Sequence, residues 1–130
     1  MTASRLVIDE IVRHAREAVP NECCGLLVGR GTTVEEAVRT PNLRASPSAY
    51  LIDPSAHVAT LRRARAEGRQ ILGAYHSHTH SPAVPSASDV AESHYPEFVH
   101  VIVSLRDPVP EVRAYTILGG GYEERRLLVR

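Results

Sequence analysis

The sequence contains no lysine and no tryptophan, and only two of its 130 residues are cysteine. All 15 basic residues are therefore arginine, so the chain has no lysine amine through which it could be tagged by an isopeptide bond. Cys23 and Cys24 are adjacent, and adjacent cysteines rarely form a disulfide because the geometry is strained. Two unbridged thiols fit a reducing compartment.

The sequence also lacks an excess of charge and any long apolar run. The 15 basic residues are balanced by 15 acidic residues, so nothing points to nucleic acid or to an anionic membrane surface as a partner. No apolar run approaches the roughly 18–20 residues of a membrane span. The first nine residues, Met1 to Asp9, lack the apolar stretch of a signal peptide. We therefore expect a cytoplasmic protein with neither nucleic-acid nor membrane partners.

The length of the chain suits one domain, residues 1–130, with a hydrophobic core of its own. An apolar content of 43% and a charged content of 23% are ordinary for a globular protein. We find no internal repeat and no linker long enough to divide the chain.

Local patterns predict an alternation of helices and strands. Helices are expected where apolar residues recur at helical spacing between capping residues, and strands where short apolar or alternating runs lie between turn residues. Asp9 and Asp53 are the predicted N-caps of the first two helices. The predicted helices are Asp9–Val19, Asp53–Glu67 and Ser86–Ser93. The predicted strands are Glu22–Gly29, Thr32–Arg39, Gln70–His78, His100–Leu105 and Glu111–Ile117, with Tyr122–Val129 as an edge strand or a short final element. This order predicts a single α/β sandwich, with one mixed or largely antiparallel sheet and helices packed against it.

The most informative stretch runs from Gly73 to Asp89 and contains two histidines two residues apart. Residues i and i+2 of a strand point to the same face, so His76 and His78 present two imidazoles side by side. A loop that folds back could add Asp89 as an oxygen ligand. Two histidines and one carboxylate leave a fourth position open for water, which is typical of a catalytic zinc site.

Hydrolysis at such a zinc requires a base for the bound water and a donor for the developing oxyanion. Glu22, at the start of another predicted buried strand, could accept the proton and pass it to the leaving amine. Ser86 could donate a hydrogen bond to the oxygen of the tetrahedral intermediate. The predicted catalytic residues are therefore Glu22 and Ser86, and the predicted metal ligands are His76, His78 and Asp89.

These five residues at their spacing resemble the motif of the JAMM (MPN-plus) zinc metalloproteases. The motif reads His76-x-His78, seven residues, Ser86, two residues, Asp89, with Glu22 upstream. The run from Glu22 to Gly29 looks like the glutamate strand of the family, and the stretch from Pro41 to Asp53 is similar to that of small stand-alone prokaryotic members. The resemblance thus covers nearly the whole chain.

The resemblance implies a deaminase-like α/β/α fold, one zinc ion, and cleavage of an amide or isopeptide bond after the C-terminal tail of a ubiquitin-like or sulfur-carrier protein. It implies similarity to peptidases that release cysteine from a sulfur carrier or trim the carrier to its diglycine end. Small relatives often dimerise, so the resemblance leaves a homodimer open. The tail is expected to bind extended along a strand edge, because glycines offer no side chains to grip.

Other classes of protein fit the sequence less well. A zinc nucleobase deaminase needs His-x-Glu and a later Pro-Cys-x-x-Cys, whereas the cysteines here are adjacent and upstream. A barrel amidohydrolase needs about 250 residues. The serious alternative is a non-catalytic MPN-type scaffold that binds a ubiquitin-like protein, but such members lose part of the motif. His80 is expected to be a loop residue at the rim, and Cys23 and Cys24 small buried hydrophobes.

Overall fold

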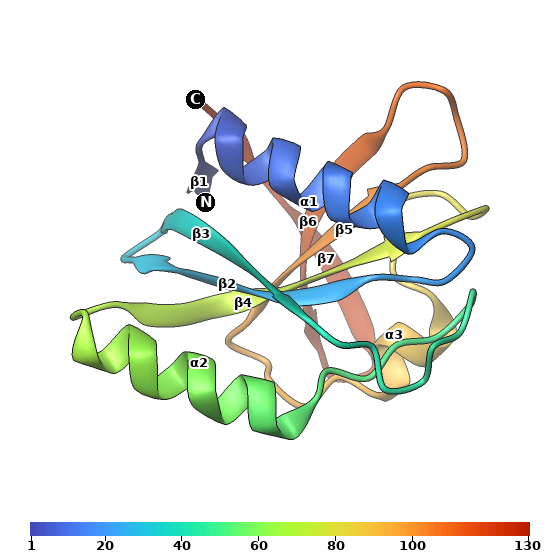
Figure 1. Ribbon diagram of the computed structural model, residues 1–130. Coiled ribbons are helices and arrows are strands. Elements are labelled where there is room, and N and C mark those ends of the chain that lie inside the picture. The colour runs from blue at the N-terminus through green and yellow to red at the C-terminus, as the bar shows by residue number, and fades with distance from the viewer.

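The computed structural model describes residues 1–130 and contains one curled sheet of eight strands with three helices (Figure 1). The helices are α1 (Arg5–Ala18), α2 (Pro54–Ala66) and α3 (Ala87–Ala91). The strands are β1 (Thr2–Ala3), β2 (Cys24–Arg30), β3 (Thr33–Thr40), β4 (Gln70–His78), β5 (Val99–Ser104), β6 (Glu111–Leu118), β7 (Gly121–Arg125) and β8 (Leu128–Val129). None of the helices is long and apolar enough to cross a membrane.

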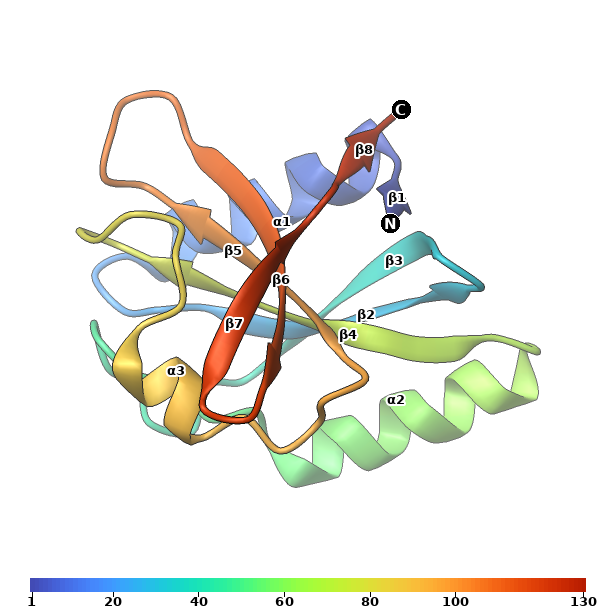
Figure 2. The same ribbon diagram turned by 180° about the vertical axis from the view of Figure 1, so that it is seen from behind.

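The sheet is mixed and curls toward closure. The strand order is β7-β6-β5-β4-β2-β3-β1-β8, with parallel pairing of β4 with β5 and of β1 with β3 and β8, and antiparallel pairing elsewhere. The first and last strands in this order are separated in the chain by Arg126 and Leu127 alone. Figure 2 shows β7 continuing into β8 across the back of the molecule. The predicted α/β sandwich with a mixed sheet is confirmed.

Alternating side chains along the central strands separate two faces of the sheet. Leu27 and Tyr75 point to the face covered by α1 and belong to the larger core cluster, whereas Leu26 and Ala74 pack with Phe98 on the other face. The helices α1 and α2 lie on opposite sides of β2, β3 and β4 in both views (Figures 1 and 2). Period-two alternation on β2 and β4 therefore sends every second residue toward α2.

Most predicted elements lie within two residues of their observed bounds, but the first helix begins earlier than predicted. Its N-cap is Ser4, whose hydroxyl accepts a hydrogen bond from the backbone N–H of Val7 at 3.2 Å, so Asp9 lies inside the helix and is not its cap. The buried face of α1 consists of Val7, Ile8, Ile11 and Ala15, which is the expected helical spacing. The Asp53 cap of α2 is confirmed, since its carboxylate accepts from the N–H of Ser55 at 2.9 Å.

The strand that carries the histidine pair lies in the middle of the sheet, between β2 and β5. At Gly73 a Cβ atom would lie 1.9 Å from the carbonyl oxygen of Val99, so only glycine lets β5 approach β4 this closely. The pairing of β4 with its two neighbours fixes the position of His76 and His78 at the end of β4.

Candidate active site

The histidine pair forms part of a ladder of side chains on the α2 side of the sheet. His76 lies opposite Cys24 of β2 and Ile102 of β5, and His78 lies opposite Ser104 of β5. Both imidazoles are almost completely buried, with 1% and 3% of their surface exposed. The regular alternation of β4 therefore turns a sequence spacing of two into two neighbouring rings.

Three side-chain atoms converge at this point. The Nε2 atoms of His76 and His78 are 3.2 Å apart, and Oδ2 of Asp89 lies 3.0 Å from the first and 3.1 Å from the second. Ligand atoms of a tetrahedral zinc ion with bonds near 2.1 Å are about 3.4 Å apart, so these distances are close to those of a zinc site. The residues that the sequence predicted as metal ligands are thus brought together.

The tautomer of His78 requires a proton or a metal ion between its ring and the carboxylate of Asp89. Nδ1 of His78 lies 2.8 Å from the carbonyl oxygen of Pro82, which can only accept, so Nδ1 carries the proton. A neutral His78 then directs the lone pair of Nε2 toward the carboxylate of Asp89. A lone pair and a carboxylate at this distance repel unless a proton or a metal ion lies between them. In a metal-bound histidine, the ring nitrogen that does not bind the metal usually donates to a carboxylate, a backbone carbonyl or a water, as Nδ1 of His78 does to Pro82.

Asp89 is positioned by the start of α3. The hydroxyl of Ser86 accepts from the N–H of Asp89 at 3.1 Å, and Oδ2 of Asp89 accepts from the N–H of Ser86 at 2.9 Å, which together form a capping box. Burial disfavours a charged carboxylate here, but contacts with both histidines outweigh burial and hold the pKa of Asp89 well below its usual range. The carboxylate is therefore ionised and oriented at neutral pH.

Glu22 lies just before β2 and is held by the loop that follows β3. Its N–H donates to the carbonyl of Ser46 at 2.8 Å, and its own carbonyl accepts from the side-chain amide of Asn42 at 3.0 Å. Glu22 is 5% exposed, and Oε1 of its carboxyl group has no hydrogen-bond partner. Burial raises the pKa of Glu22 to about 7; proximity to His78 opposes the rise and the charge of Asp89 adds to it.

Two carboxylates therefore compete for the place beside the histidine pair. A carboxylate oxygen of Glu22 and one ring nitrogen each of His76 and His78 lie within 4.8 Å of one another, so Glu22 could also complete a metal site. Asp89 contacts both Nε2 atoms directly and is ionised, whereas Glu22 stands farther off with a raised pKa. We therefore favour Asp89 as the ligand and Glu22 as a proton carrier.

Ser86 lies at the edge of the centre and is half-buried. Its hydroxyl accepts from the N–H of Asp89 and lies 3.2 Å from the hydroxyl of Ser88. If Ser88 donates in that contact, the proton of Ser86 is free to reach a substrate oxygen. Ser86 is thus placed beside Asp89 by the same capping box that positions that carboxylate.

The centre is also supported by several residues that the spacing in the sequence did not reveal. The ring of Tyr50 stacks on that of His76 with centroids 4.3 Å apart. Asn42 holds the backbone of Glu22, and the Pro82 carbonyl sets the tautomer of His78. The only local sign of the role of Asn42 in the sequence is that it is a polar residue in a loop rich in Pro and Ser. The hydroxyl of Ser77 accepts from the N–H of Cys23 at 2.8 Å and ties β4 to the start of β2.

The histidine and the two cysteines to which the sequence assigns no catalytic role lie outside the centre or are unreactive. His80 is exposed and lies in the loop just after the end of β4. Cys23 and Cys24 are free thiols buried in the sheet, and burial raises the pKa of the Cys23 thiol to about 12. Neither cysteine is therefore activated as a nucleophile at neutral pH.

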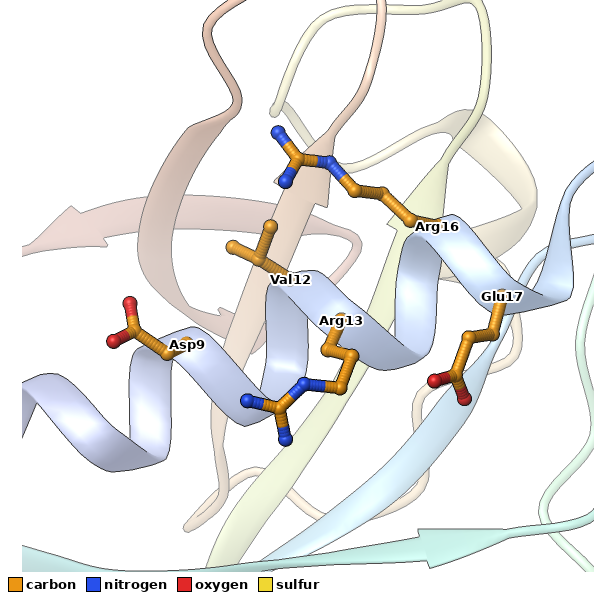
Figure 3. Close-up of a pocket in the computed structure, with 5 residues that line it drawn as sticks. All are labelled: Asp9, Val12, Arg13, Arg16 and Glu17. Carbon is orange, nitrogen blue, oxygen red and sulfur yellow. The ribbon is translucent and has the colours of Figure 1, made fainter.

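A shallow depression lies on the outer face of α1, away from the histidine pair on β4. It is lined by Asp9, Val12, Arg13, Arg16 and Glu17, which all come from the one helix. In Figure 3 the charged side chains point in different directions and do not converge on one point. Arg13 is paired with Glu10, and Glu17 is paired with Arg39. This depression has neither the burial nor the convergence of the centre on β4.

Comparison with known proteins links this centre to a family of peptidases. A model described as prokaryotic homologues of the JAB domain matches residues 4–118. A desampylase from Haloferax volcanii is 36% identical over 141 aligned positions, which cover 99% of both chains. A CysO-cysteine peptidase from Mycobacterium tuberculosis is 33% identical over 121 positions, covering 91% of this chain and 83% of the relative. A solution structure of a protein from Desulfitobacterium hafniense superimposes with a TM-score of 0.92 at 34% identity, over 99% of this chain and 92% of that one.

Proposed function

This chain belongs to the family of prokaryotic homologues of the JAB domain, and from that premise we propose that it is a zinc metallopeptidase. The proposed substrate is the C-terminal tail of a ubiquitin-like or sulfur-carrier protein, and the bond cleaved is an amide or isopeptide bond after that tail. The relatives support this choice, because their names describe a desampylase and a peptidase for a CysO–cysteine conjugate. We propose that all 130 residues form the one peptidase domain.

One observation carries the proposal. Two imidazole nitrogens and one carboxylate oxygen lie within 3.2 Å of one another, with a second buried carboxyl group alongside that has an unpaired oxygen. Such a set costs free energy in a purely structural protein, because buried acceptors without a donor are destabilising. A divalent cation and a reacting water give each of these atoms a partner.

His76, His78 and Asp89 would hold the zinc ion. Zinc bound by these residues supplies a Lewis acid that polarises a carbonyl and lowers the pKa of a water toward ~7. The His78–Pro82 contact and the Asp89–Ser86 contact keep the ligand atoms in place before substrate arrives. This order in the free protein reduces the reorganisation that the reaction needs.

Glu22 moves the proton in the proposed reaction. Its carboxylate accepts a proton from the attacking water and delivers that proton to the nitrogen of the leaving amine. A pKa raised to about 7 by burial suits both transfers, since the group can lose and gain a proton near neutral pH. Ser86 donates a hydrogen bond to the carbonyl oxygen of the cleaved bond as that oxygen gains negative charge.

We further propose that the substrate tail binds in an extended conformation along β3. This strand pairs with β1 only at Thr33 and Val34, so Glu35–Thr40 has a free edge on that side. Thr40 lies opposite Cys24, which in turn lies opposite His76, so this edge ends near the centre. Main-chain hydrogen bonds along it would hold a glycine-rich tail.

The proposal includes a cytoplasmic location, which the two free cysteines fit, and leaves monomer or homodimer as the state of the enzyme. A non-catalytic scaffold for a ubiquitin-like protein is the second candidate function. The intact set of Glu22, His76, His78, Ser86 and Asp89 favours the enzyme, since a scaffold needs none of these residues to be buried and aligned.

The test combines metal analysis with hydrolysis of carrier-protein conjugates. The purified protein should contain one zinc ion per chain, and the wild type should release the group attached to the carrier's C-terminus. Glu22→Gln should keep the zinc and lose hydrolysis, whereas His80→Gln, which alters an exposed histidine outside the centre, should keep both. A Glu22→Gln enzyme with full activity would exclude Glu22 as the base. Protein that binds no zinc would exclude the metal site, and zinc-loaded protein that binds conjugates without cleaving them would favour the scaffold.

A further inference from the structure

A cavity of about 320 Å³ lies beside the metal centre on the same face of the sheet. Its floor includes Leu26, Ala74 and His100, which lie side by side on β2, β4 and β5. Ala74 precedes His76 by two residues on β4, so the floor is the next step of the ladder that carries the predicted ligands. Asp89 also lines this cavity, which we call the His100 cavity, and joins it to the metal centre.

The walls of the His100 cavity are largely aromatic and apolar. Tyr50, stacked on His76, lines the side toward the metal centre. Tyr95 and Phe98 are stacked with ring centroids 4.6 Å apart, and His57 meets Tyr95 edge to face at 5.5 Å. A flat aromatic group packs well against such walls.

The charged groups around the His100 cavity are already paired. The guanidinium of Arg44 donates to both carboxylate oxygens of Glu92, at 2.9 and 2.7 Å. The carboxylate of Asp89 faces the two histidines. A charged group entering the cavity would therefore have no free counter-charge, and the two acidic residues would repel an anion.

Two polar atoms of the cavity-lining residues lack partners. Nε2 of His100 and Oγ of Ser93 are buried and form no hydrogen bond. His100 is only 6% exposed, and burial lowers its pKa to about 4, with His76 adding to the fall and Asp89 opposing it. The imidazole is therefore neutral at pH 7, and both atoms can hydrogen-bond to an uncharged polar group. Buried polar atoms without a hydrogen-bond partner are rare in folded proteins, so we expect a bound group to pair with them.

We propose that the His100 cavity is a subsite for one aromatic side chain of the substrate that carries a hydroxyl tip, as tyrosine does. The ring packs between Tyr50, Phe98 and Tyr95, and the hydroxyl pairs with His100 Nε2 or Ser93 Oγ. The volume is at the lower end of the roughly 300–1,000 Å³ of ligand sites, so it suits one side chain and not a folded segment. The inference rests on the proposed function, because the side chain belongs to a substrate residue that flanks the glycine-rich tail near the bond that is cleaved.

The test uses small probes on the zinc-loaded full chain with its histidines labelled with ¹⁵N. N-acetyl-tyrosinamide, N-acetyl-phenylalaninamide and N-acetyl-argininamide are titrated separately while the ring nitrogens of His100 are followed by NMR. We expect saturable shifts with the tyrosine probe and roughly 3- to 10-fold weaker binding of the phenylalanine probe, which lacks the hydroxyl. The arginine probe should give no saturable shift.

Variants of the unpaired atoms show whether they cause the preference. Ser93→Ala combined with His100→Leu should bring the two aromatic probes to equal affinity, read from the Ala74 amide signal of uniformly ¹⁵N-labelled protein. His80→Gln should leave the preference unchanged. If the double variant does not fold, Ser93→Ala alone should still reduce the preference. Equal binding of the tyrosine and phenylalanine probes to the wild type, or tightest binding of the arginine probe, would overturn the proposal.

The outcome is separable from that of the proposed function. Hydrolysis of carrier conjugates without saturable probe binding at His100 would overturn the subsite and leave the peptidase standing. Probe binding without hydrolysis of any conjugate would overturn the peptidase, and with it the role of the cavity as a substrate subsite.

Discussion

The ring of Tyr50 lies nearly parallel to the ring of His76, with centroids 4.3 Å apart and planes inclined by 20°. His76 thus has an aromatic neighbour on one face, whereas His78 is fixed through a hydrogen bond to Pro82. The two predicted ligands are held by different physical means, one by stacking and one by a polar contact. Tyr50 comes from the irregular segment between β3 and α2, so the proposed metal centre depends on how that segment folds.

The stacking predicts that the ring of Tyr50 contributes to metal affinity. Tyr50→Ala should weaken zinc binding by roughly 10-fold, since loss of a group that orients a ligand typically costs 10- to 100-fold. Tyr50→Phe keeps the ring and should bind zinc as the wild type does. Competition with a chromogenic chelator measures both affinities. Equal affinities for the wild type and Tyr50→Ala would show that His76 needs no support from this ring.

Asn42 is expected to hold the base in place. Its amide nitrogen donates to the carbonyls of Glu22 and Ala49, and its amide oxygen accepts from the N–H groups of Arg44 and Leu51. Asn42→Ala removes all four contacts, so it should lower the free energy of unfolding by about 1–3 kcal/mol and reduce kcat while zinc content stays at one per chain. Urea unfolding, peptidase rates and metal analysis provide the three values.

Ser48→Ala is the matched control for Asn42, because Ser48 is an exposed residue of the same loop. It should change neither stability nor rate by a measurable amount. A loss in Ser48→Ala as large as that in Asn42→Ala would mean that the loop responds to any substitution, and that Asn42 has no special place in it.

The parts of the fold that were predictable from sequence are those with local signals. The strand Gln70–His78 was predicted with its observed bounds, because Gly68 before it and the Pro- and Ser-rich loop after it mark its ends. The cap and proline that begin α2 were equally local. By contrast, β1 pairs with β3 and with β8 at the far end of the chain, and two residues carry too little pattern to reveal such long-range pairing.

The same distinction holds within the site. His76, His78, Ser86 and Asp89 were recognisable because a strand and a capping box fix their spacing, and Glu22 because it begins a predicted buried strand. The roles of Tyr50 and Pro82 depend on a ring that stacks and a carbonyl that accepts only after the chain has folded. The start of α1 differs from the prediction for another reason: exposed Leu6 breaks the apolar pattern at its first turn, and the capping residue is Ser4, which lies before that turn.

Ser86 is predicted to act on the rate more than on the affinity for substrate. Ser86→Ala removes the donor to the oxyanion, so kcat should fall by roughly 10²- to 10³-fold with little change in KM. Ser88→Ala, which removes only the neighbouring hydroxyl, should remain within a few-fold of the wild type. Because Ser86 also caps α3, zinc content must be measured on each variant. A rate loss explained entirely by lost zinc would assign Ser86 to support of Asp89.

Glu22 should make the metal-free protein less stable as the pH rises. Its pKa is raised by burial from 4.5 to about 7 in the folded state, so the folded state binds more protons than the unfolded state between these values. The stabilising contribution is present in full below pH 4.5, is lost as the pH approaches 7 and is constant above that. Relative to Glu22→Gln, the wild type should lose on the order of 3 kcal/mol across this range. Urea unfolding at a series of pH values in the presence of a chelator tests this, and parallel curves would contradict it.

Removal of zinc from matched variants distinguishes the two carboxylates beside the histidines. If Asp89 is the ligand, Asp89→Asn should gain little stability from added zinc, because Oδ2 no longer offers a charged third donor. Glu22→Gln should still be stabilised by about 2.7 kcal/mol when free zinc is 100 times the dissociation constant, as the wild type is. Thermal unfolding with chelator and with zinc, on wild type and both variants, gives the comparison. The reverse pattern, with zinc stabilising Asp89→Asn but not Glu22→Gln, would exchange the two roles: Glu22 would complete the metal site and Asp89 would be the proton carrier. Because Asp89 lies within 3.1 Å of both Nε2 atoms and stays ionised, we expect the first pattern.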